Sequence, residues 1–478
     1  MNQKLIGRIP EKKILANTLQ SKDAILVAVY GRRRVGKTFL IREFYGDSIK
    51  FELTGMHNAS LKHQLAEFTR SFKKTARLPP DTPPPSSWTE AFHMLGKFLL
   101  QKKKNNKCVI FIDEFPWLND RKSGFLSAFE YFWNTTADRI ENLVIVICGS
   151  AASWMIRNII NNKGGLHNRI TQKIRLLPFT LKETELFLKS RKINLDHYQI
   201  LQIYMALGGI PQYLRSIEKG DSATQTIEKA CFSKDGILTG EFENLYSSLF
   251  TNSKVHVSIV KKLASAKQGL TRQQIISQLN LSSGGRTTQM LEELEESGFI
   301  KSAAPFDKEK KDSIYRLSDE YSLFYLKFID KKKFSGKDTW IRLSKSNSYK
   351  AWSGMAFESI CLKHVAELKD DLGIGGIETY ESAWRYVPGN GKPGAQIDLL
   401  IDRSDKCINL CEIKFYGDEF MIDKAYASEI KRKLYVFQDK TKTRKSLFFT
   451  IISTFGVKKN SYSDTLVQKS LTMEALFN

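Results

Sequence analysis

Three unbroken apolar runs in the first third of the chain predict buried strands. The runs span residues 24–30, 108–112 and 143–147. Strands that are apolar at every position, and not only at every second one, are typical of a parallel sheet that helices cover on both faces. A helical pattern from about Trp88 to Gln101 follows the polar break at 82–87. The pattern therefore predicts a doubly wound α/β domain over residues 1–180.

The pattern becomes helical after this domain. Residues 181–245 are expected to form a helical lid, in which Gly208 and Gly209 end one helix and Pro211 begins the next. Residues 246–330 have the pattern of three short helices followed by two strands with a charged turn between them. This order predicts a winged helix-turn-helix.

The last part of the chain is organised differently. Residues 331–350 are basic and lack a regular apolar pattern, which predicts a linker. Residues 351–478 alternate between helix and strand patterns and predict a separate α/β domain. Its helices are expected at 351–368 and 424–438, and its strands at 378–386, 396–402, 408–415 and 447–454.

The first apolar run leads into a glycine-rich loop that predicts an ATP site. A strand before the loop and an apolar helix start after it are the context that a phosphate-binding loop requires. In such a loop the glycines bring backbone N–H groups close to the phosphates, the lysine reaches the terminal phosphates, and the hydroxyl joins the Mg²⁺ shell. The nucleotide contacts are expected from Gly31, Arg34, Val35, Gly36, Lys37, Thr38 and Phe39.

Two carboxylates directly follow the second apolar run. Asp113 lies where it would hold Mg²⁺ together with Thr38, and Glu114 lies where a base would polarise the attacking water. Behind a phosphate-binding loop, this pair predicts ATP hydrolysis as well as binding. The third run leads to Ser150, which fits a sensor of the γ-phosphate and equally well a tight loop.

Arg169 follows a flexible, glycine-containing approach at 164–165. An arginine there could reach a nucleotide held by a neighbouring subunit, as an arginine finger that supplies charge to the phosphoryl transition state. A surface salt bridge explains the residue equally well.

A second group of chemically active residues lies in the last domain. Asp398 is on one predicted strand, and Glu412 and Lys414 share a face of the next, so a hairpin would bring them together. Glu358 on the preceding helix would complete the group. Carboxylates that place Mg²⁺ and an activated water, with a lysine that stabilises developing charge, are what a Mg²⁺-dependent phosphodiesterase needs. A cross-strand ion pair without catalysis is the alternative.

Composition narrows the class of protein. The 478 residues carry a net charge of +23, which favours nucleic acid as a partner, although a merely basic surface would give the same value. No apolar segment approaches the roughly 18 residues of a membrane span, and no signal peptide is recognisable, so no membrane association and a cytoplasmic location are expected. The six cysteines lack metal-binding spacing and are expected to be buried thiols.

The predicted winged helix leaves two interpretations open. Its third helix would offer Arg286, Thr287 and Gln289 to a groove of DNA. The same helix carries acidic residues that would repel phosphates, and a role as an internal lid or protein contact is the alternative. These acids are Glu292, Glu293, Glu295 and Glu296.

Together these motifs resemble those of prokaryotic ATPases of the STAND branch of the AAA+ superfamily, in the group with an archaeal-type ATPase domain and a nuclease-like C-terminal domain. The segments that carry the resemblance are 7–11, 30–38, 112–115, 148–150 and 208–211. The resemblance implies a P-loop ATPase core, a lid whose turn at Pro211 touches the adenine side, and a winged helix that acts as a nucleotide-sensing arm. Such proteins are switches that often oligomerise on activation, so a homo-oligomer is expected.

The last domain resembles the PD-(D/E)xK fold of restriction endonucleases. Glu358 matches the acid of its first helix, and Asp398, Glu412 and Lys414 match its core motif. Ile397 stands where a proline is usual. The resemblance implies that Asp398 and Glu412 bind the metal ion.

The leading hypothesis is an ATP-controlled switch that governs a Mg²⁺-dependent nuclease acting on nucleic acid, with DNA favoured and defence as a possible setting. The alternative is a nucleotide-dependent DNA-binding or scaffold protein with a non-catalytic C-terminal domain. A third reading is a regulator that binds ATP without hydrolysing it.

Overall fold

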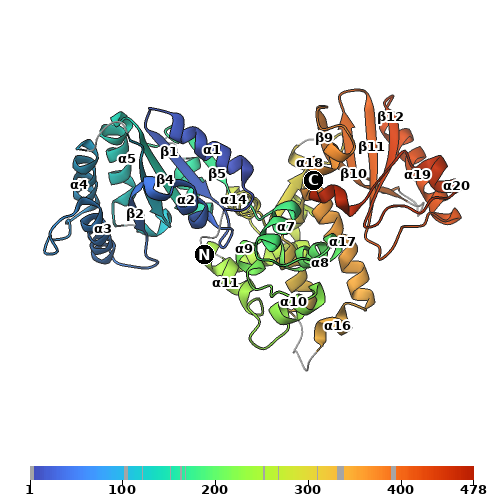
Figure 1. Ribbon diagram of the computed structural model, residues 1–478. Helices are drawn as coiled ribbons and strands as arrows, with labels where there is room; N and C mark the ends of the chain where they lie inside the picture. The colour runs from blue at the N-terminus through green and yellow to red at the C-terminus, as the bar shows by residue number, and fades with distance from the viewer. Residues whose placement is uncertain are drawn as a thin grey trace. The chain divides into compact units, whose positions relative to one another are not determined.

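The structure is a computed structural model, and the chain divides into two compact units (Figure 1). The first unit consists of residues 1–178 and 245–253, and the second of residues 179–244 and 254–478. Part of the predicted linker, 331–337, lies outside the described residues. The structure describes residues 5–101, 106–120, 122–150, 152–161, 164–166, 168–250, 253–266, 268–308, 310–330, 338–388 and 394–478.

Parallel strands form the sheet of the first unit in the order β2-β3-β4-β1-β5. Every residue of the three central strands is buried, which confirms the predicted parallel α/β sheet. The apolar-run pattern did not reveal the edge strands, because they carry exposed polar residues such as Lys50 and Lys173. The strands are β1 (Ile25–Tyr30), β2 (Ile49–Thr54), β3 (Cys108–Asp113), β4 (Leu143–Gly149) and β5 (Gln172–Arg175).

Helices pack on this sheet through a core rich in aromatic side chains. The helix predicted from Trp88 is present, and it begins where the Ser87 hydroxyl accepts a hydrogen bond from the backbone N–H of Glu90. Phe92 stacks on Phe132 with their ring centroids 5.2 Å apart, which joins α4 to α5. The helices are α1 (Ile9–Gln20), α2 (Lys37–Tyr45), α3 (Leu61–Ala76), α4 (Trp88–Leu100), α5 (Phe125–Thr135) and α6 (Ala152–Met155).

A helical segment opens the second unit, as predicted. Helix α8 ends at Gly208, which has a φ of 67°, and α9 begins at Pro211. A Cβ on Gly209 would lie 2.0 Å from the carbonyl oxygen of Phe179, so only glycine fits between these segments. The helices are α7 (Leu181–Ser190), α8 (His197–Leu207), α9 (Pro211–Leu214), α10 (Ala223–Cys231) and α11 (Glu241–Leu249).

The next segment contains the predicted three helices and two strands, together with a short third strand. The strands pair antiparallel in the order β6-β8-β7. The helices are α12 (Ser253–Ser265), α13 (Arg272–Leu279) and α14 (Gly285–Glu296), and the strands are β6 (Leu270–Thr271), β7 (Ile300–Ala303) and β8 (Ile314–Leu317).

The expected DNA-facing side of α14 needs correction. Thr287 is buried, and its Oγ1 donates to the carbonyl oxygen of Ser282 at 2.7 Å, so it is not offered to a groove. The repulsion of DNA phosphates expected from the acidic residues of α14 is also weaker, because Glu293 is buried and its Oε2 lies 2.9 Å from His256 Nε2. Glu295 accepts hydrogen bonds from the backbone and side chain of Ser302.

The prediction of a linker over 331–350 is wrong for its described part. Residues 339–343 form a helix in which Trp340 is only 3% exposed. Trp340 packs edge-on against Phe324, with ring centroids 5.0 Å apart. A single tryptophan among basic residues gives no periodic apolar pattern, so the sequence did not indicate this helix. The helices around it are α15 (Glu320–Phe328), α16 (Thr339–Leu343), α17 (Asn347–Lys363) and α18 (Val365–Asp371).

The C-terminal part of the second unit is built on a five-stranded mixed sheet in the order β13-β12-β11-β10-β9. Strands β10 and β11 form the expected antiparallel hairpin, and β11 pairs parallel with β12. The predicted helix at 351–368 is divided at His364 into α17 and α18. The elements are β9 (Thr379–Tyr386), β10 (Ala395–Arg403), β11 (Cys407–Lys414), α19 (Lys424–Thr441), β12 (Ser446–Ser453), α20 (Ser461–Leu466) and β13 (Lys469–Leu471).

Candidate functional site

The carboxyl ends of three adjacent strands meet at one edge of the first unit's sheet. Because β4 lies between β3 and β1, the residues that follow these strands are neighbours. They are Gly31 after β1, Glu114 after β3 and Ser150 after β4. Ligands of parallel α/β sheets bind beyond the carboxyl ends of the strands, so this edge is the candidate nucleotide site.

Side chains of the glycine-rich loop are already connected to the neighbouring strand. Lys37 Nζ donates to the carbonyl oxygens of Gly31 and Arg32 at 3.0 and 2.9 Å. Thr38 Oγ1 donates to Asp113 Oδ2 at 2.7 Å, which places the predicted Mg²⁺-binding pair side by side. Burial lowers the pKa of Lys37, while the nearby carboxylates of Glu114 and Asp113 oppose that shift. The Lys37 ammonium is thus held against the backbone of its own loop.

The backbone of the loop has the geometry of an anion site. Helix α2 begins at Lys37, directly after the loop, so its N-terminal N–H groups are available to phosphate oxygens. Arg34 and Gly36 have φ values of 71° and 93°. The buried Arg8 donates to the carbonyl oxygens of Val35 and Leu177, at 3.1 and 2.7 Å. The turn around Arg8 therefore lies beside the loop.

Gly31 cannot carry a side chain in this loop. Its φ is 143°, and a Cβ there would lie 2.3 Å from the carbonyl oxygen of Leu176. We expect Gly31→Ala to lower the free energy of unfolding by about 2–4 kcal/mol, because it combines backbone strain with a collision. Urea denaturation measures the change. Gly124→Ala is the control, since Gly124 also has a positive φ, 62°, but an added Cβ meets nothing within 4 Å. Equal losses for the two variants would contradict the collision argument.

Glu114 is held in place by the end of β4. Its backbone is left-handed, with a φ of 46°, and its N–H donates to Asp113 Oδ1 at 3.0 Å. Ser150 Oγ donates to Glu114 Oε2 at 2.7 Å. The Ser150 backbone N–H donates to the same oxygen at 3.2 Å. Ser150 therefore orients the predicted base, a role that the sequence did not indicate.

Arg169 and Pro211 were predicted to contact the nucleotide, and neither belongs to the group of residues described above. Arg169 is 47% exposed, and its Nη1 lies 3.8 Å from Asp138 Oδ2 of the same unit, which is the surface ion pair that the sequence left open. A role in a neighbouring subunit stays a prediction. Pro211 begins α9 in the second unit, and its contact with adenine stays a prediction as well.

The β10–β11 hairpin brings the second group of predicted residues together. Leu399 pairs with Cys411, so Asp398 and Glu412 lie at the same level of the two strands. The backbone N–H of Ile413 donates to Asp398 Oδ2 at 3.1 Å. Lys414 Nζ lies 3.3 Å from Glu412 Oε2.

Helix α19 supplies two further contacts that the sequence did not indicate. Lys433 Nζ lies 2.7 Å from Glu412 Oε1, and the Tyr426 hydroxyl donates to Glu412 Oε2 at 3.2 Å. Burial opposes the charge of Lys433, but Glu412 outweighs it and raises the Lys433 pKa. Glu412 itself is only 1% exposed. No local motif marks these partners, because they lie more than ten residues further along the chain.

Glu358 projects from α17 and completes the group with a partner of its own. Its Oε1 accepts a hydrogen bond from Arg316 Nη1 of β8 at 2.8 Å. Burial raises the pKa of Glu358, Arg316 opposes the shift, and Glu412 adds to it. The carboxylates of Glu358, Asp398 and Glu412 are therefore close enough to influence one another's ionisation.

The donor set fits Mg²⁺ in part. Among the described residues, no group of three or more His, Cys, Asp or Glu side chains is arranged to hold a metal ion. Mg²⁺ commonly uses only one or two protein carboxylates and fills its remaining positions with water and substrate phosphate. Asp398 and Glu412 supply such a pair, with Glu358 held by Arg316.

The ionisation of Asp398 gives a measurable pH dependence. Burial, reinforced by Glu412 and Glu358, raises the pKa of Asp398 to about 7. An unfolded aspartate titrates at about 3.9, whereas the folded protein favours the protonated form of Asp398. The contribution of this carboxyl to the free energy of unfolding is therefore complete below pH ~3.9 and is lost as the pH rises to about 7. In EDTA, the free energy of unfolding should fall across this window by about 1.4 kcal/mol for each unit of pKa difference.

Urea denaturation of Asp398→Asn at several pH values checks this prediction. The variant should lack this part of the pH dependence. Asp402→Asn is the matched control, since Asp402 lies on the same strand but pairs with Lys445. A profile of Asp398→Asn that parallels the unaltered protein would contradict the prediction.

The first part of the chain is similar to a known family of ATPase domains. Residues 6–217 match the family described as "ATPase domain predominantly from Archaea". The uncharacterized protein MJECL04 of Methanocaldococcus jannaschii is 24% identical over 414 residues, which cover 86% of this chain and 87% of that protein. No helix among the described residues is long and apolar enough to cross a membrane.

Solved structures show weaker similarity. The Walker-type ATPase PABY2304 of Pyrococcus abyssi is 19% identical, covers 67% of this chain and 96% of its own, and has a TM-score of 0.49. The ORC2 protein of Aeropyrum pernix, solved as ADPNP-ADP complexes, is 16% identical, covers 72% and 96%, and has a TM-score of 0.41. The match of residues 6–217 supports nucleotide binding and ATPase activity, because this segment is similar to an archaeal-type ATPase domain.

Proposed function

We propose that this protein is an ATP-hydrolysing switch that controls a Mg²⁺-dependent, nuclease-like site in its own C-terminal domain. The observation that carries the proposal is the convergence of Glu358, Asp398, Glu412 and Lys414 in a chain whose residues 6–217 match an ATPase-domain family. Nucleic acid is the proposed substrate, with DNA favoured because of the net charge of +23.

The first proposed site is the ATP site. Lys37 and the loop N–H groups would hold the β- and γ-phosphates, and Thr38 with Asp113 would hold Mg²⁺, which neutralises charge on the phosphates when bound. Glu114 would orient and polarise the attacking water, in the position that Ser150 fixes. Arg169 as a finger, Pro211 at the adenine and a homo-oligomeric active form are parts of the same proposal.

The second proposed site is the carboxylate group. Asp398 and Glu412 would hold Mg²⁺, which would activate a water molecule for attack on a phosphodiester. Lys414 would stabilise the charge that develops on the phosphate. The region from 246 to 330, proposed as a winged helix, would transmit the nucleotide state, and defence against foreign nucleic acid is the proposed setting.

A direct assay tests the nuclease half. The full-length protein is incubated with Mg²⁺, with labelled DNA or RNA, and with ATP, ADP or no nucleotide. Cleavage that depends on the nucleotide supports the proposal. Absence of cleavage under every condition, with Asp398→Ala indistinguishable from the unaltered protein, would refute it.

One observation favours a second candidate, a nucleotide-dependent DNA-binding or scaffold protein. Glu412 already has contacts from Lys414, Lys433 and Tyr426, as a purely structural ion pair would. Calorimetric titration with Mn²⁺ separates the candidates. Absence of a site that depends on Asp398 and Glu412 would favour the binding protein.

A further inference from the structure

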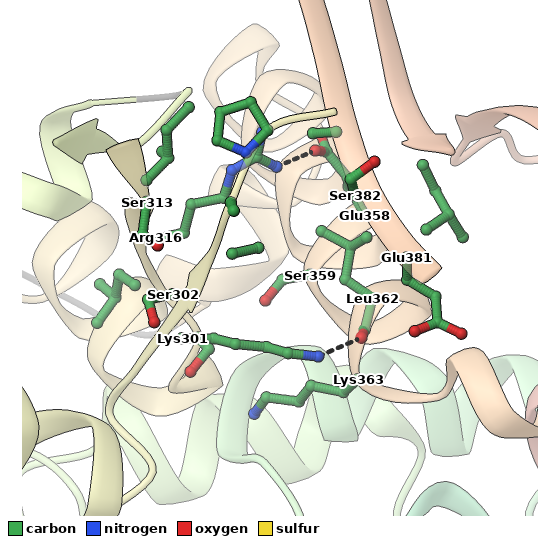
Figure 2. A pocket seen from close by; sticks show the side chains of 18 of the residues that line it. Lys301, Ser302, Ser313, Arg316, Glu358, Ser359, Leu362, Lys363, Glu381 and Ser382 are labelled. Atoms are coloured by element: carbon green, nitrogen blue, oxygen red, sulfur yellow. Dashed lines mark hydrogen bonds and ion pairs between the residues drawn. The ribbon is translucent and has the colours of Figure 1, made fainter. Parts of the chain in front are cut away.

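A cavity of about 540 Å³ lies between β7, β8, α17 and β9, all within the second unit (Figure 2). This volume is in the range of small-molecule sites. Much of the wall is apolar, and it includes Leu263, Ala304, Pro305, Leu317, Met355 and Val365. No motif from the sequence accounts for this space.

Among the charged side chains of the wall, cations outnumber carboxylates. Lys301, Lys308, Arg316 and Lys363 line the cavity, against Glu358 and Glu381. Two of these charged side chains already form ion pairs with residues that do not line the cavity. Lys363 Nζ lies 2.6 Å from Glu320, and Glu381 lies 2.8 Å from Lys369 Nζ.

Lys301 is one of the exposed cations of the group. Figure 2 shows its side chain extending from β7 toward α17, where Nζ donates to the carbonyl oxygen of Leu362 at 3.0 Å. Within the described part of the chain, no carboxylate oxygen lies within 4 Å of this ammonium.

Ser382 provides an independent sign that a polar ligand is missing. It lies on β9, lines the cavity and is only 4% exposed. Among the described residues, its Oγ has no hydrogen-bond partner. A buried hydroxyl without a partner destabilises a fold unless a ligand or water satisfies it.

We propose that this cavity binds a small phosphorylated molecule with an apolar ring. The ring would lie on the apolar wall, and the phosphate would pair with Arg316. Lys301 stands opposite Arg316 in the antiparallel β7–β8 pair, and its ammonium would leave the Leu362 carbonyl oxygen to pair with the same phosphate. Arg316 has five N–H donors, and its hydrogen bond to Glu358 uses only Nη1, so the guanidinium can reach a second anion. The Ser382 hydroxyl would hydrogen-bond to the same ligand.

A consequence follows for Glu358, and this part alone rests on the proposed nuclease-like site. The phosphate would compete with Glu358 for Arg316. A Glu358 carboxylate released from Arg316 would join Asp398 and Glu412 as a metal ligand. Ligand binding would therefore strengthen metal binding at the carboxylate group.

The test uses 1-naphthyl phosphate as the probe, titrated into the full-length protein by calorimetry with ADP and Mg²⁺ present to occupy the ATP site. We expect binding at one site per chain. Lys301→Met and Arg316→Met should each weaken it about tenfold, as loss of a charge-assisted hydrogen bond predicts. Ala304→Phe, which fills the cavity without altering a charge, should abolish it.

Controls make each outcome decisive. Lys234→Met removes an exposed lysine elsewhere in the unit and should leave the affinity unchanged. Lack of binding, equal binding of 1-naphthol, or equal affinity of all variants would overturn the proposal.

Mn²⁺ titrations with and without the probe separately test whether ligand binding strengthens metal binding at the carboxylate group. Probe binding that leaves Mn²⁺ affinity unchanged would overturn the coupling to Glu358 and leave the cavity site standing.

Discussion

Glu114→Gln is expected to lower ATP turnover by about two to three orders of magnitude while ATP binding is retained. The amide keeps the shape of the carboxylate and can still accept the Ser150 hydrogen bonds, so the loop around it is preserved. It cannot take a proton from the attacking water, and loss of a general base typically costs 10²–10⁴-fold. Phosphate release at saturating ATP measures turnover, and binding of a fluorescent ATP analogue measures affinity.

Glu52→Gln is the matched control for this substitution. Glu52 lies on β2 of the same sheet and pairs with Arg42 at the surface, so its loss should leave turnover unchanged. If Glu114→Gln turns over ATP at the original rate, Glu114 is not the base. The protein would then be either a binder of ATP or an ATPase with another base.

In the first unit, the sequence predicted the centre of the sheet better than its edges. Strands β1, β3 and β4 are buried at every position, so their apolar runs marked them directly. An edge strand such as β2 has only one covered edge and alternates in exposure, which weakens the signal in a single sequence. The helix around Trp340 was missed because its burial depends on aromatic partners on α15 and α17.

The same contrast holds for the candidate sites. Residues whose role follows from spacing along one strand or loop were predicted, as for Lys37 with Thr38 and Glu412 with Lys414. Contacts between distant elements were not, because no local pattern encodes them. The ion pair of Arg316 with Glu358 joins residues 42 positions apart, and the ion pair of Lys433 with Glu412 joins residues 21 apart.

These distant contacts change how the carboxylate group is understood. From the sequence, Glu358 was expected to complete a metal site. In the structure its carboxylate is held by Arg316, and Glu412 is surrounded by cations. The arrangement resembles a site in which charge is balanced by side chains until a metal ion and substrate replace them. Its activity would then depend on conditions that release Glu358.

Asp398→Asn is expected to reduce Mg²⁺-dependent cleavage of nucleic acid by about a thousandfold or more. The asparagine has the same shape but lacks the charge that would hold Mg²⁺ opposite Glu412, and metal activation of water contributes several kcal/mol, where ~1.4 kcal/mol is a factor of ten. Cleavage of labelled DNA under the most active nucleotide condition measures the loss. Mn²⁺ calorimetry on the same variant should show weakened metal binding.

Asp402→Asn separates this effect from general damage to the strand. Asp402 follows Asp398 on β10, and its partner is Lys445, so its loss should leave both cleavage and metal binding unchanged. Cleavage that survives in Asp398→Asn would refute the metal role of Asp398. Loss of metal binding without any cleavage by the unaltered protein would instead identify a metal-dependent binding domain. Because metal binding and cleavage are measured on the same pair of variants, the two candidate functions predict different combinations of results.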